Sequence, residues 1–510
     1  MPQIKLHRHC AQRSGIGQHQ RSAAFPTGMS IHRLESQPHI SQLLITTSVS
    51  GGSVRCRGYS TRALPAETYV DVVGFGNLCV DAVLPMEELP PADRGIRRQL
   101  LDTLTRSPPD RSSWEVGGNC NFMVAASRLG LQVASVGHIG TDIYGEFMDE
   151  VLRSEGIQAT TRIAPSRSTP HEPPELPFAQ NTPNGGSTSG THLDSTLICF
   201  VLVDPRSRHA FCSRYDFGPW PLLEGIRTLP REATSVLRSA RAVFTNGFIF
   251  DELPLEAVQG ACNDAIQHGA AIFFDPGPRC QTMLEGPRRA ALDLLLDLSA
   301  VVLMTEEEAR VVTGLADPEA AAQWVLARPG CRAEWVVVKM GGQGALLCAR
   351  KDANSNGSSS SRTGSAIKGK GNRKENGGCG CSQSSGSSTA LTTTTRLGAV
   401  KVEVLDTVGC GDSFAAAVVM GFISGWPGDV TLALANAVGG ATATGRGAGR
   451  NVARLEKVLA LLEDGAAGAA DGGLEQAAAF ARAQELLLQS LASRQHWRDQ
   501  SREQQLSAAA

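Results

Sequence analysis

The residues of this chain best suited to chemistry lie in one short motif, residues 406–412, which reads Asp-Thr-Val-Gly-Cys-Gly-Asp. A strand-like run, 402–405, precedes the motif and a helix-like run, 415–420, follows it. Glycines at the start of a helix let backbone N–H groups converge on an anion. Asp412, at the same point, is suited to take a proton from a hydroxyl that attacks a phosphoryl group held there. The alternative is that Asp412 only caps the helix, since Asp favours helix starts.

Three more polar clusters occur where predicted strands end or predicted helices begin, which is where open α/β sheets bind ligands. The first is a turn after the first predicted strand, and it carries Asp81. The second, residues 117–121 (Gly-Gly-Asn-Cys-Asn), opens a predicted helix. The third, residues 305–308 (Thr-Glu-Glu-Glu), follows a predicted strand. This acidic run could equally be an ordinary first turn of a helix, where negative charge is favourable.

Strand-like and helix-like segments alternate around these clusters, most regularly between residues 241 and 339. The predicted strands are 69–76, 133–136, 242–245, 271–274, 301–304 and 335–339, and the predicted helices are 119–130, 143–155 and three that begin near 254, 283 and 306. This alternation predicts an α/β fold with a central, mostly parallel sheet covered by helices on both faces. Residues 195–214 stand apart and are predicted to form a β-hairpin.

The composition argues against several classes of protein. The formal net charge is −2, with 48 Lys and Arg against 50 Asp and Glu, so the chain lacks the basic excess of a dedicated nucleic-acid binder. No apolar run reaches membrane-spanning length; the best candidate, 290–304, contains Asp293 and Asp297. The 13 cysteines show no regular close spacing, which favours a reducing compartment over a disulfide scaffold.

The chain divides into a central domain, 67–465, and segments of different composition. Residues 1–66 are basic, serine-rich and poor in acids, as in an organellar transit peptide or a disordered leader. If residues 1–66 are a transit peptide, the expected location is an organelle, with the chloroplast favoured over the mitochondrion. If they are not, the expected location is the cytoplasm. Residues 162–194 and 351–396 are predicted to be flexible insertions, and 466–510 an Ala-rich helical extension, interpreted as an exposed appendage.

In this order, the motifs resemble those of the ribokinase-like, or pfkB-type, family of ATP-dependent sugar and nucleoside kinases. The resemblance covers about residues 68–465 apart from the insertions, and it includes Gly341–Gly344 after a strand and Leu434–Gly439 after the motif helix. The sequences Val-Gly-Cys-Gly-Asp and Gly-Ala-Gly-Arg-Asn are most similar to those of plant and algal members of the family whose substrate is unassigned. The resemblance implies a ribokinase-like fold with a small β lid, formed by about 77–113 and 195–214.

The resemblance also implies a role for each matching residue. Asp412 would be the general base, and the backbone N–H groups of Gly409, Cys410 and Gly411 would form the anion hole for the γ-phosphoryl group. Substrate hydroxyls would be bound by Asp81 and Asn121, with Gly117 and Gly118 allowing close approach. ATP would be bound by Lys339, Gly342, Gly344, Thr407 and Asn436.

A metal ion is implied as well. Glu308 would hold Mg²⁺ through water, although this chain has Thr305 where the family usually has Asn, and Lys339 where a Thr is common. Backbone carbonyls of residues 441–449 would bind a monovalent cation such as K⁺.

The predicted function is an ATP-dependent phosphotransferase that moves the γ-phosphoryl group to an alcohol of a sugar or sugar-like acceptor. A nucleoside kinase of the same fold and a non-catalytic plastid scaffold are the alternatives. The expected partners are a small-molecule sugar or nucleoside and a second copy through the β lid, with no nucleic acid and no membrane. Cys410 has two interpretations: a reactive thiolate at a helix N-terminus, or a small residue that fills space.

Overall fold

The computed structural model describes residues 70–162, 195–206, 208–218, 220–351 and 392–509. All of these residues fall in one compact unit of the chain. The predicted leader, 1–66, and most of the two predicted insertions lie outside the described residues. Among the helices that are described, none combines the length and the apolar character needed to cross a membrane.

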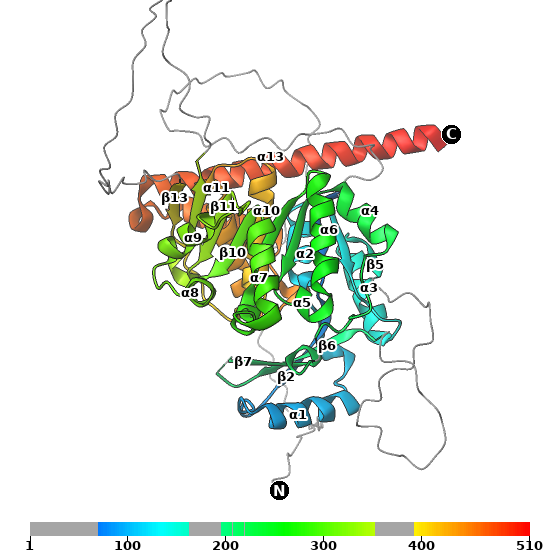
Figure 1. The fold of residues 1–510 in the computed structure, drawn as a ribbon. Coiled ribbons are helices and arrows are strands. Elements are labelled where there is room, and N and C mark those ends of the chain that lie inside the picture. Colours follow the sequence, from blue (N-terminus) through cyan, green and yellow to red (C-terminus); the bar gives the residue numbers. More distant parts are fainter. Residues whose placement is uncertain (1–69, 163–194, 207, 219, 352–391, 510) are drawn as a thin grey trace, which may run out of the picture. The chain divides into compact units, whose positions relative to one another are not determined.

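A nine-stranded sheet forms the centre of the molecule, with the order β13-β12-β11-β10-β9-β8-β1-β4-β5 (Figure 1). Neighbouring strands from β5 to β11 are parallel, and only β12 runs against them, so the pairs β11–β12 and β12–β13 are antiparallel. The strands are β1 (Val70–Phe75), β4 (Val133–Gly137), β5 (Gln158–Arg162), β8 (Ala240–Asn246), β9 (Ala271–Asp275), β10 (Val301–Thr305), β11 (Trp335–Lys339), β12 (Ala345–Arg350) and β13 (Thr392–Leu397). The inner strands are continuous apolar runs because both of their faces are buried.

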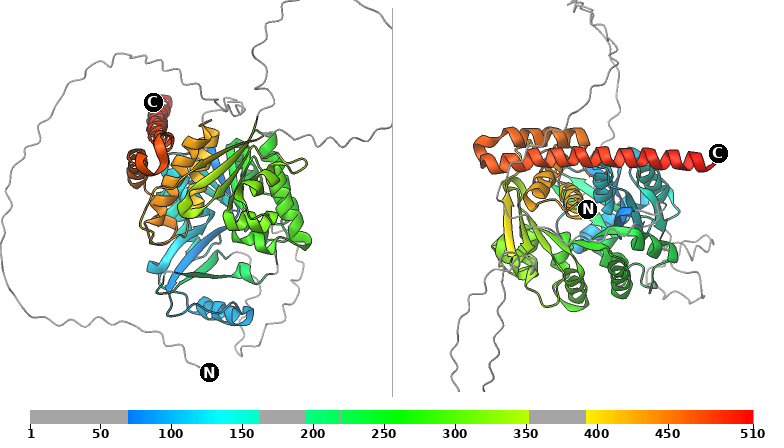
Figure 2. Two further views of the ribbon diagram at one scale, coloured as in Figure 1. Left: turned by 90° about the vertical axis from the view of Figure 1, so that its left-hand side faces the viewer. Right: turned by 90° about the horizontal axis from the view of Figure 1, so that it is seen from above.

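Helices cover both faces of this sheet, so the predicted α/β class is confirmed (Figure 2). The helices over one face are α2 (Asn119–Arg128), α10 (Cys410–Ile423) and α11 (Gly428–Ala443), with α3 (Ile143–Ser154) in the same core. The helices over the other face are α4 (Arg231–Ser239), α6 (Leu255–Gln267), α7 (Gly286–Leu298), α8 (Glu306–Thr313) and α9 (Pro318–Leu326), together with the short α5 (Ile249–Glu252).

A second, smaller sheet has the order β3-β2-β6-β7; three of its strands come from the segments expected to form the lid, and β3 lies just beyond the expected range 77–113. Its strands are β2 (Leu78–Pro85), β3 (Trp114–Gly118), β6 (Leu197–Val203) and β7 (His209–Ser213). The predicted hairpin is confirmed, since β6 and β7 pair antiparallel. The helix α1 (Arg94–Arg106) packs on the outer face, where the Cys212 thiol donates to the Arg97 carbonyl (Figure 1).

Two predictions about the segments before the motif are wrong. The run 402–405 is not a strand; Val404 and Leu405 are 57% and 43% exposed, and no sheet neighbour covers them. Instead, residues 392–397, expected to belong to an insertion, form β13, which pairs with β12. The threonine run was assigned to the insertion by its polarity, but β-branched threonines fit a half-exposed edge strand well.

The C-terminal extension is not an exposed appendage, so that interpretation is also wrong. It contains α13 (Ala469–Ala509), which packs along α11 and along α12 (Leu455–Ala467), the last helix before the extension (Figure 2). The Phe480 ring is fully buried over Gly465 of α12, where a Cβ would lie 2.6 Å from the ring. Further along α13, the Arg494 guanidinium pairs with the buried Asp71 carboxylate of β1. The extension is therefore part of the folded domain.

Neighbouring leucines of α13 give a test of this packing. Leu487 is fully buried, whereas Leu488 is 48% exposed. We expect Leu487→Ala to lower the free energy of unfolding by roughly 2–5 kcal/mol, because it removes buried methyl groups and leaves a cavity. Leu488→Ala should change it by less than about 0.5 kcal/mol. Urea denaturation of both variants measures the difference, and equal effects would mean that α13 does not pack on the domain.

Candidate active site

Asp412 lies in the first turn of α10, and the glycines before it shape its surroundings. Gly409 precedes the helix with φ = +78°, a left-handed conformation that favours glycine. A Cβ at Gly411 would lie 3.3 Å from the Lys339 ammonium, so that ammonium lies beside the helix N-terminus. The first N–H groups of a helix have no partner within it, and its dipole is positive there. Together these features suit an anion at the turn 409–412, and the predicted anion hole stays a prediction.

The Asp412 carboxyl is held from across the molecule by Asn121 of α2. The Asn121 amide donates to Asp412 Oδ2 over 3.1 Å, while Asn121 Oδ1 accepts the Gly449 backbone N–H over 2.8 Å. Burial raises the pKa of Asp412 to about 6, and the bond from Asn121 opposes that rise. The structure therefore shows Asn121 positioning Asp412, while its predicted contact with substrate hydroxyls stays a prediction.

A cluster of charges at the ends of β9 and β11 adjoins Asp412. Lys339 Nζ lies 2.5 Å from Asp275 Oδ2, and both side chains are largely buried. Burial alone would lower the pKa of Lys339, but Asp275 and Glu308 outweigh it and raise this pKa, so the side chain stays an ammonium. The Asp275 carboxylate also raises the pKa of Asp412. The sequence offered one signal for Asp275, its place at the end of a predicted parallel strand, but we did not predict it as a site residue.

Glu308 takes part in two structures. It forms a capping box with Thr305 at the start of α8: the Thr305 backbone N–H donates to Glu308 Oε2 over 2.7 Å, and the Glu308 N–H donates to Thr305 Oγ1 over 3.2 Å. The interpretation of the acidic run as an ordinary first turn of a helix is thus correct, because Glu308 caps α8. Burial, followed by the charge on Asp275, also raises the pKa of Glu308, which places this carboxyl within reach of the Asp275–Lys339 pair.

Asp81 occupies a space that only glycines leave open. A Cβ at Gly117 would lie 2.2 Å from Asp81 Oδ1, and a Cβ at Gly118, where φ is +60°, would lie 2.6 Å from the Asn77 carbonyl oxygen. Asp81 lies on the inner face of the small sheet, paired with Cys199 of β6. Burial raises its pKa to about 7, a thiol hydrogen bond from Cys79 opposes the rise, and the charge of Asp412 adds to it. Asp81 and Asp412 are therefore close enough to influence each other.

The residues predicted to bind ATP are brought together beyond β11. The turn Gly341–Gln343 follows Lys339 directly, and a Cβ at Gly344 would lie 2.0 Å from the Leu397 carbonyl oxygen. The Asn436 amide donates to the carbonyls of Leu397 and Gly398, which joins α11 to the end of β13. Gly342 and Thr407 border solvent, since a Cβ at Gly342 would meet nothing within 4 Å and Thr407 is exposed. Their contacts with a nucleotide stay predictions.

Cys410 fits the space-filling interpretation. Burial, and then the charges of Asp406 and Asp412, raise the pKa of its thiol to about 12. The positive end of the helix would stabilise a thiolate, but these effects are larger. The raised pKa favours the space-filling interpretation, and the reactivity of this thiol stays a prediction.

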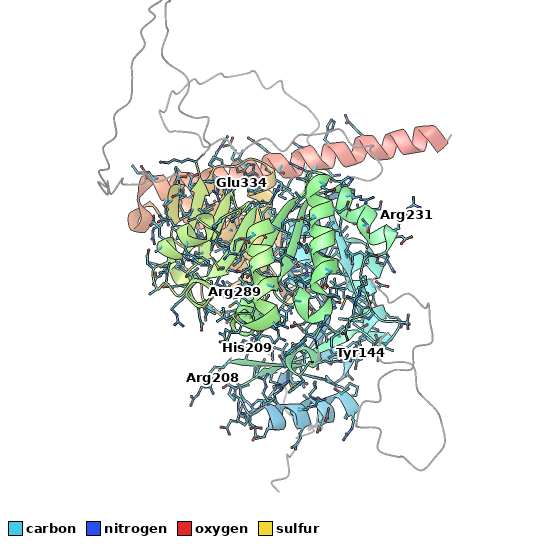
Figure 3. The ribbon with its side chains drawn as sticks, viewed as in Figure 1. Tyr144, Arg208, His209, Arg231, Arg289 and Glu334 are labelled. Atoms are coloured by element: carbon cyan, nitrogen blue, oxygen red, sulfur yellow. The ribbon has the colours of Figure 1, made fainter. Side chains whose placement is uncertain are left out.

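Two contacts that the sequence did not reveal join the small sheet to the segments around Asp412. His209 of β7 lies where that strand approaches the large sheet (Figure 3), with its Nε2 3.3 Å from Asp406 Oδ1. Arg450 pairs with Glu115 of β3 over 2.9 Å. In each of the two pairs, the partners are more than 190 residues apart in the chain. No local sequence pattern could therefore have indicated these pairs.

Comparison with known proteins agrees with this geometry. The sequence profile described as pfkB family carbohydrate kinase matches residues 223–360 and 376–454. A 5-dehydro-2-deoxygluconokinase of Geobacillus thermodenitrificans is 22% identical over 373 residues, which are 70% of this chain and 82% of the relative. The 5-dehydro-2-deoxygluconokinase 2 of Bacillus cereus is 23% identical over 387 residues, 74% and 88% of the two chains.

Solved structures share the fold. A putative ribokinase II from E. coli, in complex with ATP and Mg²⁺, aligns with a TM-score of 0.52 and 18% identity over 77% of this chain and 99% of that one. Arabidopsis thaliana ribokinase, complexed with ribose and ATP, aligns with a TM-score of 0.50 and 16% identity over 77% and 98%. The fold is therefore ribokinase-like, and within it residues 223–360 and 376–454 are similar to the pfkB carbohydrate kinase family. The family profile and these relatives are all named for sugar kinases, which supports an ATP-dependent carbohydrate kinase as the class of this protein.

The raised pKa of Asp81 predicts a pH-dependent effect on stability. The folded protein keeps the Asp81 proton up to about pH 7, whereas the unfolded chain loses it near the ordinary value of 3.8. Stability of the natural protein therefore falls as pH rises between these values, by at most about 1.4 kcal/mol per pH unit. Asp81→Asn should gain stability relative to the natural protein across this window, measured by urea denaturation at several pH values. The exposed Asp102→Asn is the control, and a difference independent of pH would contradict the assignment.

Proposed function

We propose that the protein transfers the γ-phosphoryl group of ATP to a hydroxyl of a sugar or sugar-like acceptor, with Asp412 as the general base. The observation that supports this most is the half-buried Asp412 carboxyl, held by Asn121 beside the N-terminus of α10 and the Lys339 ammonium. A carboxyl with a pKa of about 6 is ionised near neutral pH and accepts a proton readily from an attacking hydroxyl. A helix cap alone would not need to be buried among other acids.

The transferring phosphoryl group would lie against the turn 409–412. The helix N-terminus offers backbone N–H donors, and Lys339 adds a positive charge beside Gly411. These donors are fixed before any ligand arrives, so they stabilise developing negative charge without reorganisation. Gly342, Gly344, Thr407 and Asn436 are proposed to line the nucleotide, which places it beyond the end of β11.

The acids of this site suit Mg²⁺. Asp275, Glu308 and Asp412 surround a single ammonium, so negative charge is in excess. Among the described residues, no three acidic, histidine or cysteine side chains converge as a complete metal centre. Mg²⁺ keeps several waters and is held partly by substrate phosphates, so it needs only one or two carboxylates from a protein. Bound Mg²⁺ would neutralise phosphate charge, with Glu308 and Asp275 as the proposed protein side of its shell.

The acceptor would lie between Asp81, Gly117 and Gly118 and the inner face of the small sheet. Carboxylate oxygens are strong acceptors for hydroxyl groups, which suits a polyol. The bacterial relatives are named for a deoxygluconate derivative and the plant neighbour was solved with ribose, which supports a sugar over a nucleoside. A monovalent cation at residues 441–449, a homodimer through the lid and an organellar location are further proposals.

Removal of the proposed base gives the first test. We expect Asp412→Asn to lower kcat by about 10²–10⁴, because an amide cannot take the proton from the acceptor. Binding of ATP should remain close to that of the natural protein, measured by calorimetry. A sugar-panel phosphorylation assay supplies kcat. Asp429→Asn, the same substitution in the first turn of α11, is the matched control and should keep its activity, because Asp429 is not one of the proposed site residues. Near-normal turnover by Asp412→Asn would contradict the proposal that Asp412 is the general base.

The pH dependence gives a second test. Because Asp412 must be ionised to act as a base, kcat/KM should rise with pH through about 6 and then level off. The bond from Asn121 lowers the pKa of Asp412, so Asn121→Ala should move this midpoint to higher pH. The measurement is kcat/KM between pH 5 and pH 9 for both proteins. An unchanged midpoint in the variant would show that another group controls the profile.

A further inference from the structure

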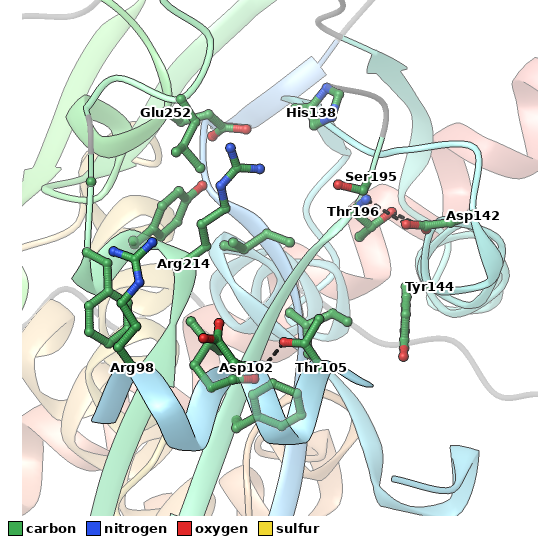
Figure 4. A pocket seen from close by; sticks show the side chains of 18 of the residues that line it. Arg98, Asp102, Thr105, His138, Asp142, Tyr144, Ser195, Thr196, Arg214 and Glu252 are labelled. Carbon is green, nitrogen blue, oxygen red and sulfur yellow. Dashed lines mark hydrogen bonds between the residues drawn. The ribbon is translucent and has the colours of Figure 1, made fainter. Parts of the chain in front are cut away.

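A cavity of about 700 Å³ lies beside the small sheet, away from the proposed sugar site (Figure 4). It is lined by α1, β6, the start of α3, the segment 214–223 and Glu252. Asp81 pairs with Cys199 of β6 and shares the inner face with it. Successive residues of a strand point to opposite faces, so Ile198 and Phe200, which line the cavity, belong to the outer face. Leu197, which also lines the cavity, shares the face of Cys199, so the cavity reaches the end of β6 but lies mainly on the face opposite to Asp81.

Glu252, the last residue of α5, is the most unusual group of this cavity. It is only 4% exposed, and its Oε2 has no hydrogen-bond partner among the described residues. Its neighbour Asp251 is also buried but forms ion pairs of 2.7 Å with both Arg279 and Arg288. A buried polar atom without a partner costs free energy, so it indicates a missing ligand or water. Burial raises the pKa of Glu252 to about 8, so its carboxyl is mostly protonated at neutral pH and has an O–H to donate.

The cavity combines hydrogen-bond donors at one end with an apolar wall. The Arg214 side chain extends toward Glu252 (Figure 4), and Arg98 and Arg106 of α1 add two further positive charges. Asp142, another lining acid, is already engaged by the Gly145 N–H and by the N–H and hydroxyl of Thr196. The apolar part of the wall consists of Leu101, Ile198, Phe200, Phe217, Leu222 and Leu223.

We propose that this cavity binds a small organic anion with an apolar body, whose carboxylate or phosphate is held by Arg214 and the Glu252 carboxyl. A guanidinium and a carboxylic acid both donate, which matches an oxygen anion. The apolar wall suits an aliphatic or aromatic body and is a poor match for a bare sugar. An occupant would also contact β6, whose opposite face carries Cys199 beside Asp81, so the site lies on an element shared with the proposed sugar site.

Fluorescence titration of the full-length protein tests the proposal. The probe is anilinonaphthalene sulfonate, an aromatic anion, with a non-hydrolysable ATP analogue present to fill the nucleotide site. We expect saturable binding that phenyl phosphate and phenylacetate displace and that benzyl alcohol does not. Arg214→Gln should weaken dye binding by about tenfold or more, as expected for loss of a charged hydrogen bond. Arg231→Gln, an exposed arginine outside the cavity (Figure 3), is the matched control.

Two further variants make the outcome decisive. Glu252→Ala should weaken dye binding, and should that variant fail to fold, Ile198→Trp, which fills the cavity, should abolish binding instead. Asp412→Asn should bind the dye normally, so the result does not depend on the proposed catalytic role. Equal displacement by benzyl alcohol, or unchanged binding in Arg214→Gln, would overturn the proposal and leave a cavity that holds only water.

Discussion

The need to keep the half-buried Asp412 carboxyl able to ionise is the constraint on which the site depends. A carboxylate taken out of water needs hydrogen bonds and opposite charge. Asn121, far away in the sequence, supplies the hydrogen bond, and Lys339 supplies the charge at the end of β11. Lys339 in turn stays charged because Asp275 and Glu308 surround it. The negative charge of each acid in the cluster is thus compensated by the Lys339 ammonium, which the other acids keep protonated.

The same principle joins the small sheet to the large one. Arg450 lies in the turn that also offers its Gly449 N–H to Asn121, and it reaches Glu115 of β3. His209 of β7 reaches Asp406, whose carboxylate also accepts the backbone N–H groups of Val408 and Gly447. The polar contacts that orient the catalytic loop are therefore the ones that hold the small sheet against it. A movement of the small sheet would therefore change these contacts and displace the loop.

The sequence was sufficient for the parts of the structure that depend on local order. Alternating strand and helix patterns predicted the sheet, and the position of Asp412 at a helix start was correct. Contacts between distant segments were out of reach: Asn121 with Asp412, Lys339 with Asp275, and Arg494 with Asp71. Two segments of polar composition were predicted to be exposed, although both pack in the folded domain. The threonines of β13 and the polar helix α13 both looked exposed, yet one pairs in the sheet and the other buries Phe480.

The position of the long segment between β12 and β13 has an evolutionary consequence. Its two ends, Arg350 and Thr392, are paired directly across adjacent antiparallel strands at one edge of the large sheet. The fold therefore requires only that the chain return to its starting point, and the entropy of closing such a loop grows slowly with its length. Sequence can be gained or lost there by drift without moving any residue of the catalytic cluster. This edge of the sheet can accumulate lineage-specific sequence while the enzyme beneath it stays the same.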